Sequence, residues 1–427
     1  MTAHGSIGGV LRHRLPAVVV LGVILIAAPV RARLNEQSKA PSARNSGSLQ
    51  AQRLLETRDF EYAGAFRLPS TDENGDSFSY GGRPLAFNPA RRSLFVGSNS
   101  GQIAEVTIPE TRKAERVEDL AFARYLHTFT DPTDGHMSEV APSGTVLAGL
   151  LVFDERLLGT GLIFYDANNT QIVSHFMRPL NLAVRGATPM RRVWEPGGAG
   201  FVGGYMAAVP EQWQAALGGP AVTGQCCVPI ISRTSWGPAA FAWDPRGLAN
   251  SSALSAKPLL YYSGEHQTLG PWNGSNPTWG GTASVAGMVI PEGTRTALFF
   301  GANGSGTFCY GEGTWDKALD GKPVPGGERY CYDPLSPDKG QHAYPYRYQM
   351  WAYDLMDLAD VAEGKRDPWD VKPYGVWPLD LPFSDGVFPR ILSVAYDPSR
   401  RLVYLSQFKG DKDGESYRGL IHVFYIT

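Results

Sequence analysis

The chain has 427 residues and a formal net charge of −2, and 43% of its residues are hydrophobic. This apolar content is enough to form a core, and it excludes a chain that is disordered throughout. Glycine and proline are frequent, with 49 and 32 residues respectively, which favours many short strands joined by turns over long helices. The balanced charge gives no electrostatic reason to expect nucleic acid or an anionic membrane as a partner.

Residues 1–32 have the features of a targeting segment. Arg12 and Arg14 precede an apolar run from Leu15 to Ala28, and Val30-Arg31-Ala32 places small residues at the spacing of a cleavage site. The run is shorter than the roughly 20 residues of a membrane-spanning helix. We therefore expect a signal peptide, with an uncleaved N-terminal anchor as the alternative. Its removal would leave 36 basic and 41 acidic residues, a net charge of −5, in a secreted or periplasmic protein without integral membrane association.

The rest of the chain predicts one linker and one folded region. Residues 33–58 are polar and lack apolar periodicity, which predicts a flexible linker. The next segment alternates in hydrophobicity and ends at Pro69, as an opening strand would. No linker-like break in composition divides residues 59–427, so we expect them to form a single domain.

One sequence element recurs near both ends of this region. Residues 86–97, AFNPARRSLFVG, are matched by residues 395–406, AYDPSRRLVYLS. Each copy predicts a strand, an Asx-Pro turn with a basic pair, and a second strand. Further hairpins are predicted to begin near residues 144, 200, 240 and 285. A short helix is predicted from Met356 to Glu363, ended by Gly364.

These hairpins and their spacing resemble secreted β-propeller proteins in general, although the Gly-His and Trp-Asp signatures of WD40 blades are missing. The resemblance implies an all-β fold with a single propeller. At roughly 45–60 residues per blade we expect six or seven blades, with five or eight left open. Two β-sandwich domains are the alternative. We expect the last strand, Leu420 to Ile426, to pair with the first blade and so remove exposed sheet edges.

Four cysteines in an exported chain are expected to form disulfides. Cys309 and Cys331 would close a modest loop, whereas Cys226 and Cys227 are adjacent and would form a strained bond. Four cysteines allow three pairings, and the sequence does not choose among them. A Cys226–Cys227 bond would resemble the vicinal disulfide of quinone-dependent propeller dehydrogenases.

The segment from Ser263 to Gly274 follows an apolar predicted strand and is the best candidate for a ligand-binding loop. Glu265 and His266 are the candidate catalytic residues, because a carboxylate and an imidazole can act as general base and acid. Trp272 is a candidate ligand-binding residue, because an indole ring can stack on a sugar. The alternative is an exposed loop with a packed tryptophan.

Other candidate ligand-binding residues are His136, in the polar segment Asp131 to Glu139, and several arginines. The polar segment matches no metal-site spacing, and the sequence assigns neither a metal nor a cofactor. The arginines that could hold an anionic group are Arg83, Arg233, Arg295, Arg347 and Arg390. All ten tryptophans lie between Trp194 and Trp377, a distribution that suits either carbohydrate stacking or core packing.

Three functional hypotheses follow from these features. The first is an exported propeller that binds a carbohydrate or similar polar small molecule or glycan at its channel mouth, where propellers present their loops. If it is an enzyme, it is then a polysaccharide lyase or a glycoside hydrolase. The second is a non-catalytic binding or scaffold module. The third is a quinone- or metal-dependent oxidoreductase that uses the adjacent cysteines.

Overall fold

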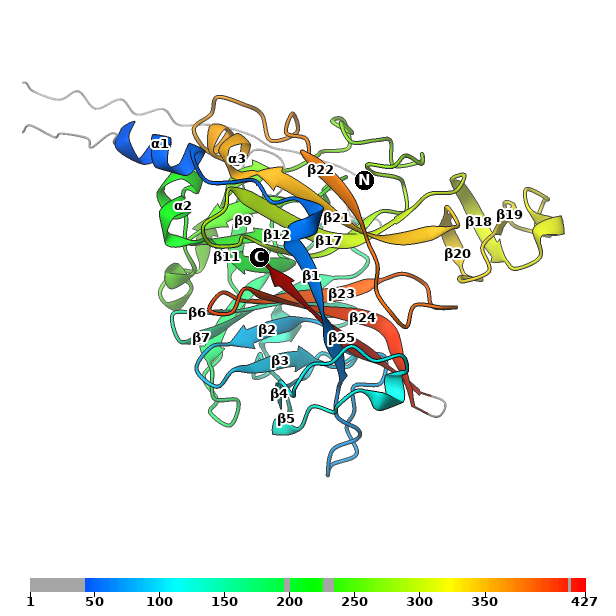
Figure 1. Cartoon of the computed structure of the whole chain (residues 1–427), viewed down its shortest axis with the longest axis horizontal. Coiled ribbons are helices and arrows are strands. Elements are labelled where there is room, and N and C mark those ends of the chain that lie inside the picture. The colour runs from blue at the N-terminus through cyan, green and yellow to red at the C-terminus, as the bar shows by residue number, and fades with distance from the viewer. Residues whose placement is uncertain (1–42, 196–199, 226–233, 414–415) are drawn as a thin grey trace, which may run out of the picture. The chain divides into compact units, whose positions relative to one another are not determined.

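The computed structural model describes residues 43–195, 200–225, 234–413 and 416–427. The chain divides after Ser42 into two compact units. All described residues belong to the second unit, Ala43–Thr427. The predicted signal peptide and residues 33–42 of the predicted linker lie outside the described residues. From Ala43 onward the chain is mostly β, as its composition predicts (Figure 1).

Five antiparallel sheets of three or four strands form most of the described chain (Figure 1). In their strand orders they are β2 (Leu85–Asn88), β3 (Ser93–Gly97), β4 (Ile103–Thr107) and β5 (Tyr125–Thr130); β6 (Thr145–Phe153), β7 (Arg156–Ile163) and β8 (His175–Pro179); β11 (Tyr205–Ala208), β12 (Ala221–Gly224), β13 (Ala240–Trp243) and β15 (Lys257–Leu260); β16 (Ser284–Val289), β17 (Thr296–Gly304), β21 (Tyr346–Asp354) and β22 (Gly375–Leu379); and β23 (Ile391–Asp397), β24 (Leu402–Asp413), β25 (Ser416–Ile426) and β1 (Phe60–Arg67).

Two smaller sheets and a few short helices lie between these strands. The small sheets are β9 (Arg192–Glu195), β10 (Gly200–Phe201) and β14 (Ala253–Ser255), and β18 (Cys309–Thr314), β19 (Tyr330–Tyr332) and β20 (Lys339–His342). The α-helices are α1 (Ala43–Gln50), within the range predicted as a linker, α2 (Glu211–Leu217) and α3 (Leu355–Ala362). Within the described ranges, no helix has the length and apolar character of a membrane-spanning segment.

The repeated hairpin of the sequence is also a repeated structure. β2 and β3 form the first copy, and β23 and β24 form the second. In each turn the Asx side chain accepts a hydrogen bond from the backbone two residues later, at 3.2 Å for Asn88 and 3.0 Å for Asp397. The second arginine of each basic pair has a positive φ, 51° at Arg92 and 56° at Arg401. The matching letters therefore encode the same turn.

The first strands of the five sheets contact one another in sequence. β2 contacts β6, β6 contacts β11, β11 contacts β16, β16 contacts β23, and β23 contacts β2. A hydrophobic cluster lies between each pair of neighbouring sheets. Members from the two facing sheets are, for example, Phe95 and Leu157, Leu158 and Phe241, Tyr205 and Phe299, Phe300 and Phe424, and Tyr404 and Phe87.

The first and last strands of the described chain lie side by side in one of these sheets. β1 pairs with β25 over seven residue pairs, from Phe60 opposite Ile426 to Arg67 opposite Leu420. Phe60 and Phe424 stack with their ring centroids 4.5 Å apart. The last strand was expected to pair with the first blade, but it pairs with β1 in the sheet of β23 and β24 and not with the sheet of the opening hairpin, β2 and β3. The predicted helix at Met356 is confirmed, since Asp354 caps α3 and Gly364 follows it with a φ of 73°.

This pairing of the chain ends predicts an unequal response to two neighbouring substitutions. Phe424 is 3% exposed and Tyr425 is 44% exposed. We expect Phe424→Ala to lower the free energy of unfolding by about 3–5 kcal/mol, and the matched control Tyr425→Ala to lower it by less than about 1 kcal/mol. Urea unfolding followed by fluorescence measures both. Equal small losses would show that the β1–β25 contact contributes little to stability.

Candidate functional site

A cavity of about 560 Å³ lies where the first strands of the five sheets begin. Its lining includes a residue at the start of each first strand or just before it. These residues are Arg83 before β2, Leu147 on β6, Tyr205 on β11, Val285 on β16 and Ile391 on β23. Four of the sheets, and the segment that leads into the fifth, therefore contribute to the cavity wall. We call it the arginine cavity.

Two arginines, Arg83 and Arg390, line the arginine cavity. Arg83 precedes β2 and Arg390 precedes β23, so each leads into one copy of the repeated hairpin. Burial lowers the pKa of Arg83, and burial together with the positive charge of Arg83 lowers the pKa of Arg390 to about 10. Both groups stay protonated at neutral pH. Within the described ranges, no carboxylate contributes to either pKa shift or forms a salt bridge with either guanidinium group.

A buried amide faces the same cavity. The Gln225 side chain is 5% exposed, and neither its oxygen nor its nitrogen has a hydrogen-bond partner within the described part of the chain. A buried amide normally donates and accepts hydrogen bonds. Beside this cavity, Gln225 therefore has both a donor and an acceptor left unpaired.

A second cavity, of about 510 Å³, adjoins the first and shares Ser284 and Gln341 with it. Three tryptophans line this second cavity: Trp236, Trp272 and Trp279. The rings of Trp236 and Trp272 lie 6.3 Å apart, centroid to centroid. We call it the tryptophan cavity. Together the two cavities offer aromatic faces beside polar and cationic groups.

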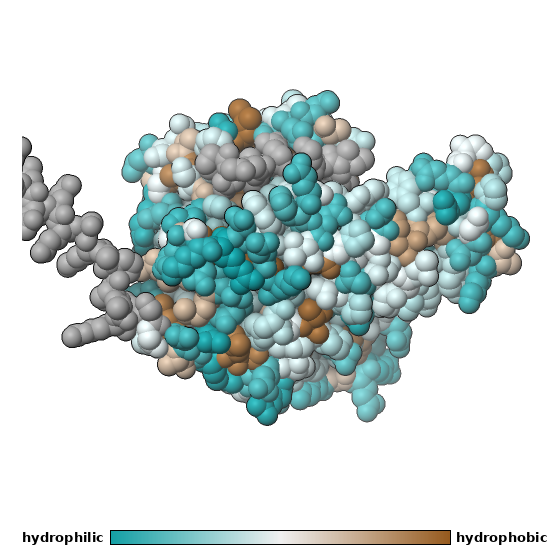
Figure 2. Space-filling view, turned by 90° about the horizontal axis from the view of Figure 1, so that it is seen from above, coloured by the Kyte–Doolittle hydropathy of each residue, from teal (hydrophilic) through white to brown (hydrophobic). Residues whose placement is uncertain are grey.

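An excursion between β17 and β21, residues 305–345, completes the tryptophan cavity. It contains β18, β19 and β20 and extends to the right of the five sheets in both views (Figures 1 and 2). It contributes Tyr310, Lys339 and Gln341 to the cavity wall. The disulfide between Cys309 and Cys331, with a Cα–Cα distance of 5.8 Å, links β18 to β19. This bond confirms one of the pairings that the sequence left open.

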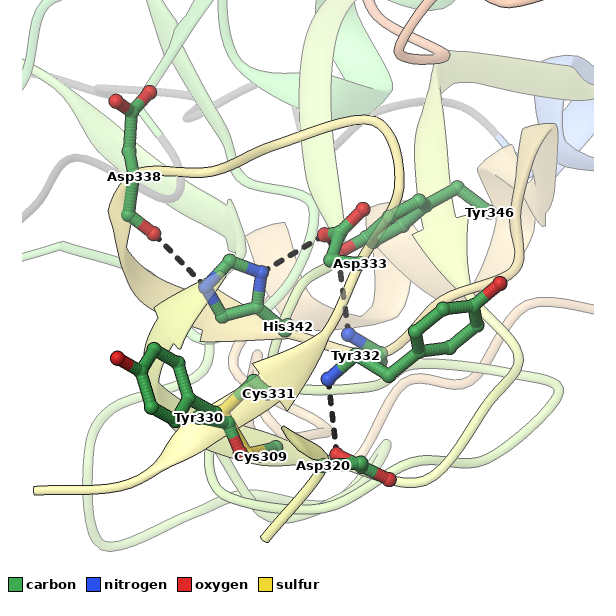
Figure 3. Close-up of a disulfide and its surroundings, with 10 residues drawn as sticks. Cys309, Asp320, Tyr330, Cys331, Tyr332, Asp333, Asp338, His342 and Tyr346 are labelled. Atoms are coloured by element: carbon green, nitrogen blue, oxygen red, sulfur yellow. Dashed lines mark hydrogen bonds and ion pairs between the residues drawn. A yellow bond between two sulfur atoms is a disulfide. The ribbon is translucent and has the colours of Figure 1, made fainter. Parts of the chain in front are cut away.

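A buried histidine–aspartate pair holds the same excursion together (Figure 3). His342 Nδ1 lies 2.8 Å from Asp333 Oδ2, and His342 Nε2 lies 3.0 Å from the Asp338 carbonyl oxygen. Burial alone would lower the pKa of His342, but the hydrogen bond and the negative charge of Asp333 outweigh it and the net shift is upward. Both ring nitrogens lie beside acceptors, which favours the protonated ring and leaves neither nitrogen available to a ligand.

The described lining of the two cavities is aromatic, polar and cationic. None of the described residues that line them is Asp, Glu or His. Across the described residues, no group of three or more His, Cys, Asp or Glu side chains is placed to hold a metal ion. The lining favours binding through stacking, hydrogen bonds and positive charge.

The structure separates the residues of the predicted binding loop. Trp272 lines the tryptophan cavity. Glu265 is exposed, and the ring of His266 stacks on Trp369 at 4.2 Å, with Nδ1 2.9 Å from Ser263 Oγ. Neither Glu265 nor His266 belongs to the lining of the two cavities, and their catalytic roles stay predictions.

Of the other predicted ligand-binding residues, some line a cavity and some lie elsewhere. Arg83 lines the arginine cavity, as described above. Arg295 lies 3.2 Å from a carboxylate oxygen of Asp354, and Arg347 donates to the Gln349 side chain at 2.9 Å. These two arginines already have partners outside the two cavities. The same is true of His136, whose Nδ1 lies 2.7 Å from a carboxylate oxygen in the same turn.

Some site residues were missed by the sequence reasoning, and some predictions remain untested. Gln225, Ser284 and Gln341 carry no local signal, because only the arrangement of the sheets brings them together. Trp236 and Trp279 belong to the tryptophan-rich range, which was the only hint of an aromatic site. Cys226, Cys227 and Arg233 lie outside the described residues.

Comparison with known proteins adds little to this geometry. No family model matches the chain, and no curated protein matches it. Among solved structures, the chain is similar to a luciferin-regenerating enzyme at 9% sequence identity and a TM-score of 0.32, with 88% of this chain and 95% of that chain covered. A similarity at this TM-score carries no argument, so the site is interpreted from its own residues.

The His342–Asp333 pair predicts a pH dependence of the excursion. Because the folded pKa of His342 is raised, its contribution to stability is full below the unfolded pKa of about 6.5 and is lost as the pH rises through the folded value. We expect His342→Gln to reduce the protection of the β19 and β20 amides in hydrogen exchange. The difference from the wild type should be larger at pH 6 than at pH 9.

The control for this measurement is His136→Gln, a substitution outside the excursion. It should leave the exchange of the β19 and β20 amides unchanged at both pH values. An effect of His342→Gln that grows with increasing pH would contradict the assignment of a charged imidazole.

Proposed function

We propose that the five sheets are the blades of a single five-bladed β-propeller. Two observations support this architecture: the first strands contact one another in a cycle that returns from β23 to β2, and a hydrophobic cluster lies between each pair of neighbouring sheets. On this proposal β1 and β25 close the ring by joining the chain ends in one blade. Five blades is fewer than the expected six or seven and is one of the two numbers that the sequence left open.

We also propose that the protein is exported and binds a carbohydrate or similar polar ligand. The ligand site would be the mouth where the arginine and tryptophan cavities adjoin. The observation that carries this proposal is the junction of the two cavities at Ser284 and Gln341, which places stacking faces beside hydrogen-bonding groups. Sugars present both an apolar ring face and hydroxyl groups, and they are bound by this combination.

The surface and the disulfide support the same proposal. Figure 2 shows one face of the molecule, on which hydrophobic residues are scattered among polar ones and form no continuous patch. A large apolar patch would favour a protein partner instead. The Cys309–Cys331 bond is typical of exported proteins, in which disulfides persist.

Between catalysis and binding, the described lining favours a binding module. General acid–base cleavage of a glycan commonly uses two carboxylates, and no described residue in either cavity wall provides one. A lyase or hydrolase that uses Glu265 and His266 is the second candidate, because these residues share a loop with Trp272. The oxidoreductase hypothesis depends on Cys226 and Cys227, which lie outside the described residues.

The carbohydrate proposal predicts specific binding on a glycan array through the tryptophan cavity. We expect Trp272→Ala to weaken the tightest array ligand by about tenfold, equivalent to ~1.4 kcal/mol, because a stacking face is lost. Trp315→Ala is the matched control, since Trp315 is 75% exposed and lines neither cavity. Isothermal titration measures both variants. Binding to no glycan, or equal losses in the two variants, would refute the proposal.

The choice between binding and cleavage is tested by prolonged incubation with the same glycan. We expect mass spectrometry to show the glycan intact, because no described residue of either cavity wall is Asp, Glu or His. If shortened products form and disappear in both Glu265→Gln and His266→Ala, the enzyme hypothesis replaces the binding module.

A further inference from the structure

Arg83 and Arg390 differ from three buried or part-buried arginines of the described chain that have close polar partners. Arg67 lies 2.9 Å from one oxygen of Asp411, and Arg418 lies 3.2 Å from the other. Arg178, which is 1% exposed, donates to several backbone carbonyl oxygens. In contrast, Arg83 and Arg390 both line the arginine cavity, and neither guanidinium group has a carboxylate partner in the described part of the chain.

This arrangement is unfavourable unless something else neutralises it. Two like charges in a part-buried site repel one another, and each loses hydration. The ring of Phe408, 5.6 Å from the Arg390 guanidinium carbon, offers only a weak cation–π contact. A bound anion would neutralise both arginines at once, and guanidinium groups bind carboxylates and sulfates through paired hydrogen bonds.

Gln225 provides an independent indication of a ligand in the same place. Gln225 is 5% exposed and lines the same cavity, and its buried amide has no partner for either polar atom in the described structure. Leaving such a group unsatisfied costs stability. An oxyanion or a hydroxyl group in the arginine cavity would satisfy the amide together with the two arginines.

We propose that the ligand is an acidic saccharide. Its anionic group, a carboxylate or a sulfate ester, would bind to Arg83 and Arg390 beside the Gln225 amide. A neighbouring sugar ring would lie in the tryptophan cavity. The saccharide part rests on the proposed function, whereas the anion site rests on the arginine cavity alone.

The first arm of the test measures the anion site without any sugar. Unfolding temperatures are recorded in sodium sulfate and in sodium chloride of equal ionic strength. Sulfate stabilises most proteins by exclusion from their surface, so the measured quantity is the difference between the wild type and Arg83→Gln/Arg390→Gln. We expect an additional, saturable gain in the wild type that this double variant lacks. Arg58→Gln, at a 79% exposed side chain, is the matched control and should keep the gain.

The second arm measures the saccharide. The probes are tri-galacturonate, its neutral methyl ester, and a galactose trisaccharide with one sulfate ester, titrated calorimetrically. We expect the wild type to bind at least one acidic probe about tenfold more tightly than the neutral ester. The double variant should bind all three alike. The acidic probe that binds more tightly shows whether the ligand carries a uronic acid or a sulfate ester. The Arg390→Lys variant should retain only part of the preference for acidic over neutral probes, because an ammonium group lacks the paired donors of a guanidinium group.

Stability separates a binding role of the arginines from a structural one. Because the two guanidinium groups repel each other, Arg390→Gln alone should unfold at the same temperature as the wild type or at a higher one. A marked decrease, together with unchanged discrimination between acidic and neutral probes, would assign Arg390 a structural role and overturn the proposal.

The two arms also separate the two proposals. If neutral and acidic sugars bind equally through Trp272 and sulfate stabilises all variants alike, the anion inference fails while the proposed function stands. If no sugar binds but the sulfate effect depends on the arginines, the proposed function and the acidic-saccharide assignment both fail.

Discussion

The pairing of β1 with β25 is the interaction on which the rest of the structure depends. It places the first and last strands of the described unit in one sheet, and that sheet contacts its neighbours through β23. The pairing holds the segment that leads into β2 beside the sheet of β23, and β23 also contacts β2 directly. Arg390 and Arg83 precede these two strands, and both residues line one cavity. Fold and candidate site are thus linked by a single constraint.

Local sequence patterns predicted the local parts of this structure well. The Asx-Pro turn with its basic pair depends only on neighbouring residues, which is why both copies of the hairpin were recognisable. The cap and the glycine stop of α3 are local for the same reason. The number of large sheets is not a local property. Excursions such as the one that carries Cys309 and Cys331 lengthen the chain without adding a large sheet. An estimate that divides the chain length by the length of one blade therefore gives more blades than the five large sheets.

The candidate site was predictable only in part because its residues come from distant segments. Arg83 and Trp272 were selected for their chemistry, and both line a cavity. Arg295 and Arg347 have the same chemistry as Arg83, but their partners lie elsewhere, and no sequence pattern distinguishes these cases. The Asp333–His342 pair shows the reverse situation, in which groups typical of catalysis serve to hold the excursion beside the cavity. Burial and partners, more than residue type, decide the role of each group.

The central claim is that a ligand binds where the first strands of the five sheets begin. The most direct test is a crystal structure of the protein with its tightest array glycan. The account predicts a sugar ring against Trp236 or Trp272 and polar groups of the ligand at Arg83, Arg390 and Gln225. A glycan bound on the exposed loop at Glu265, with both cavities free of ligand, would contradict it.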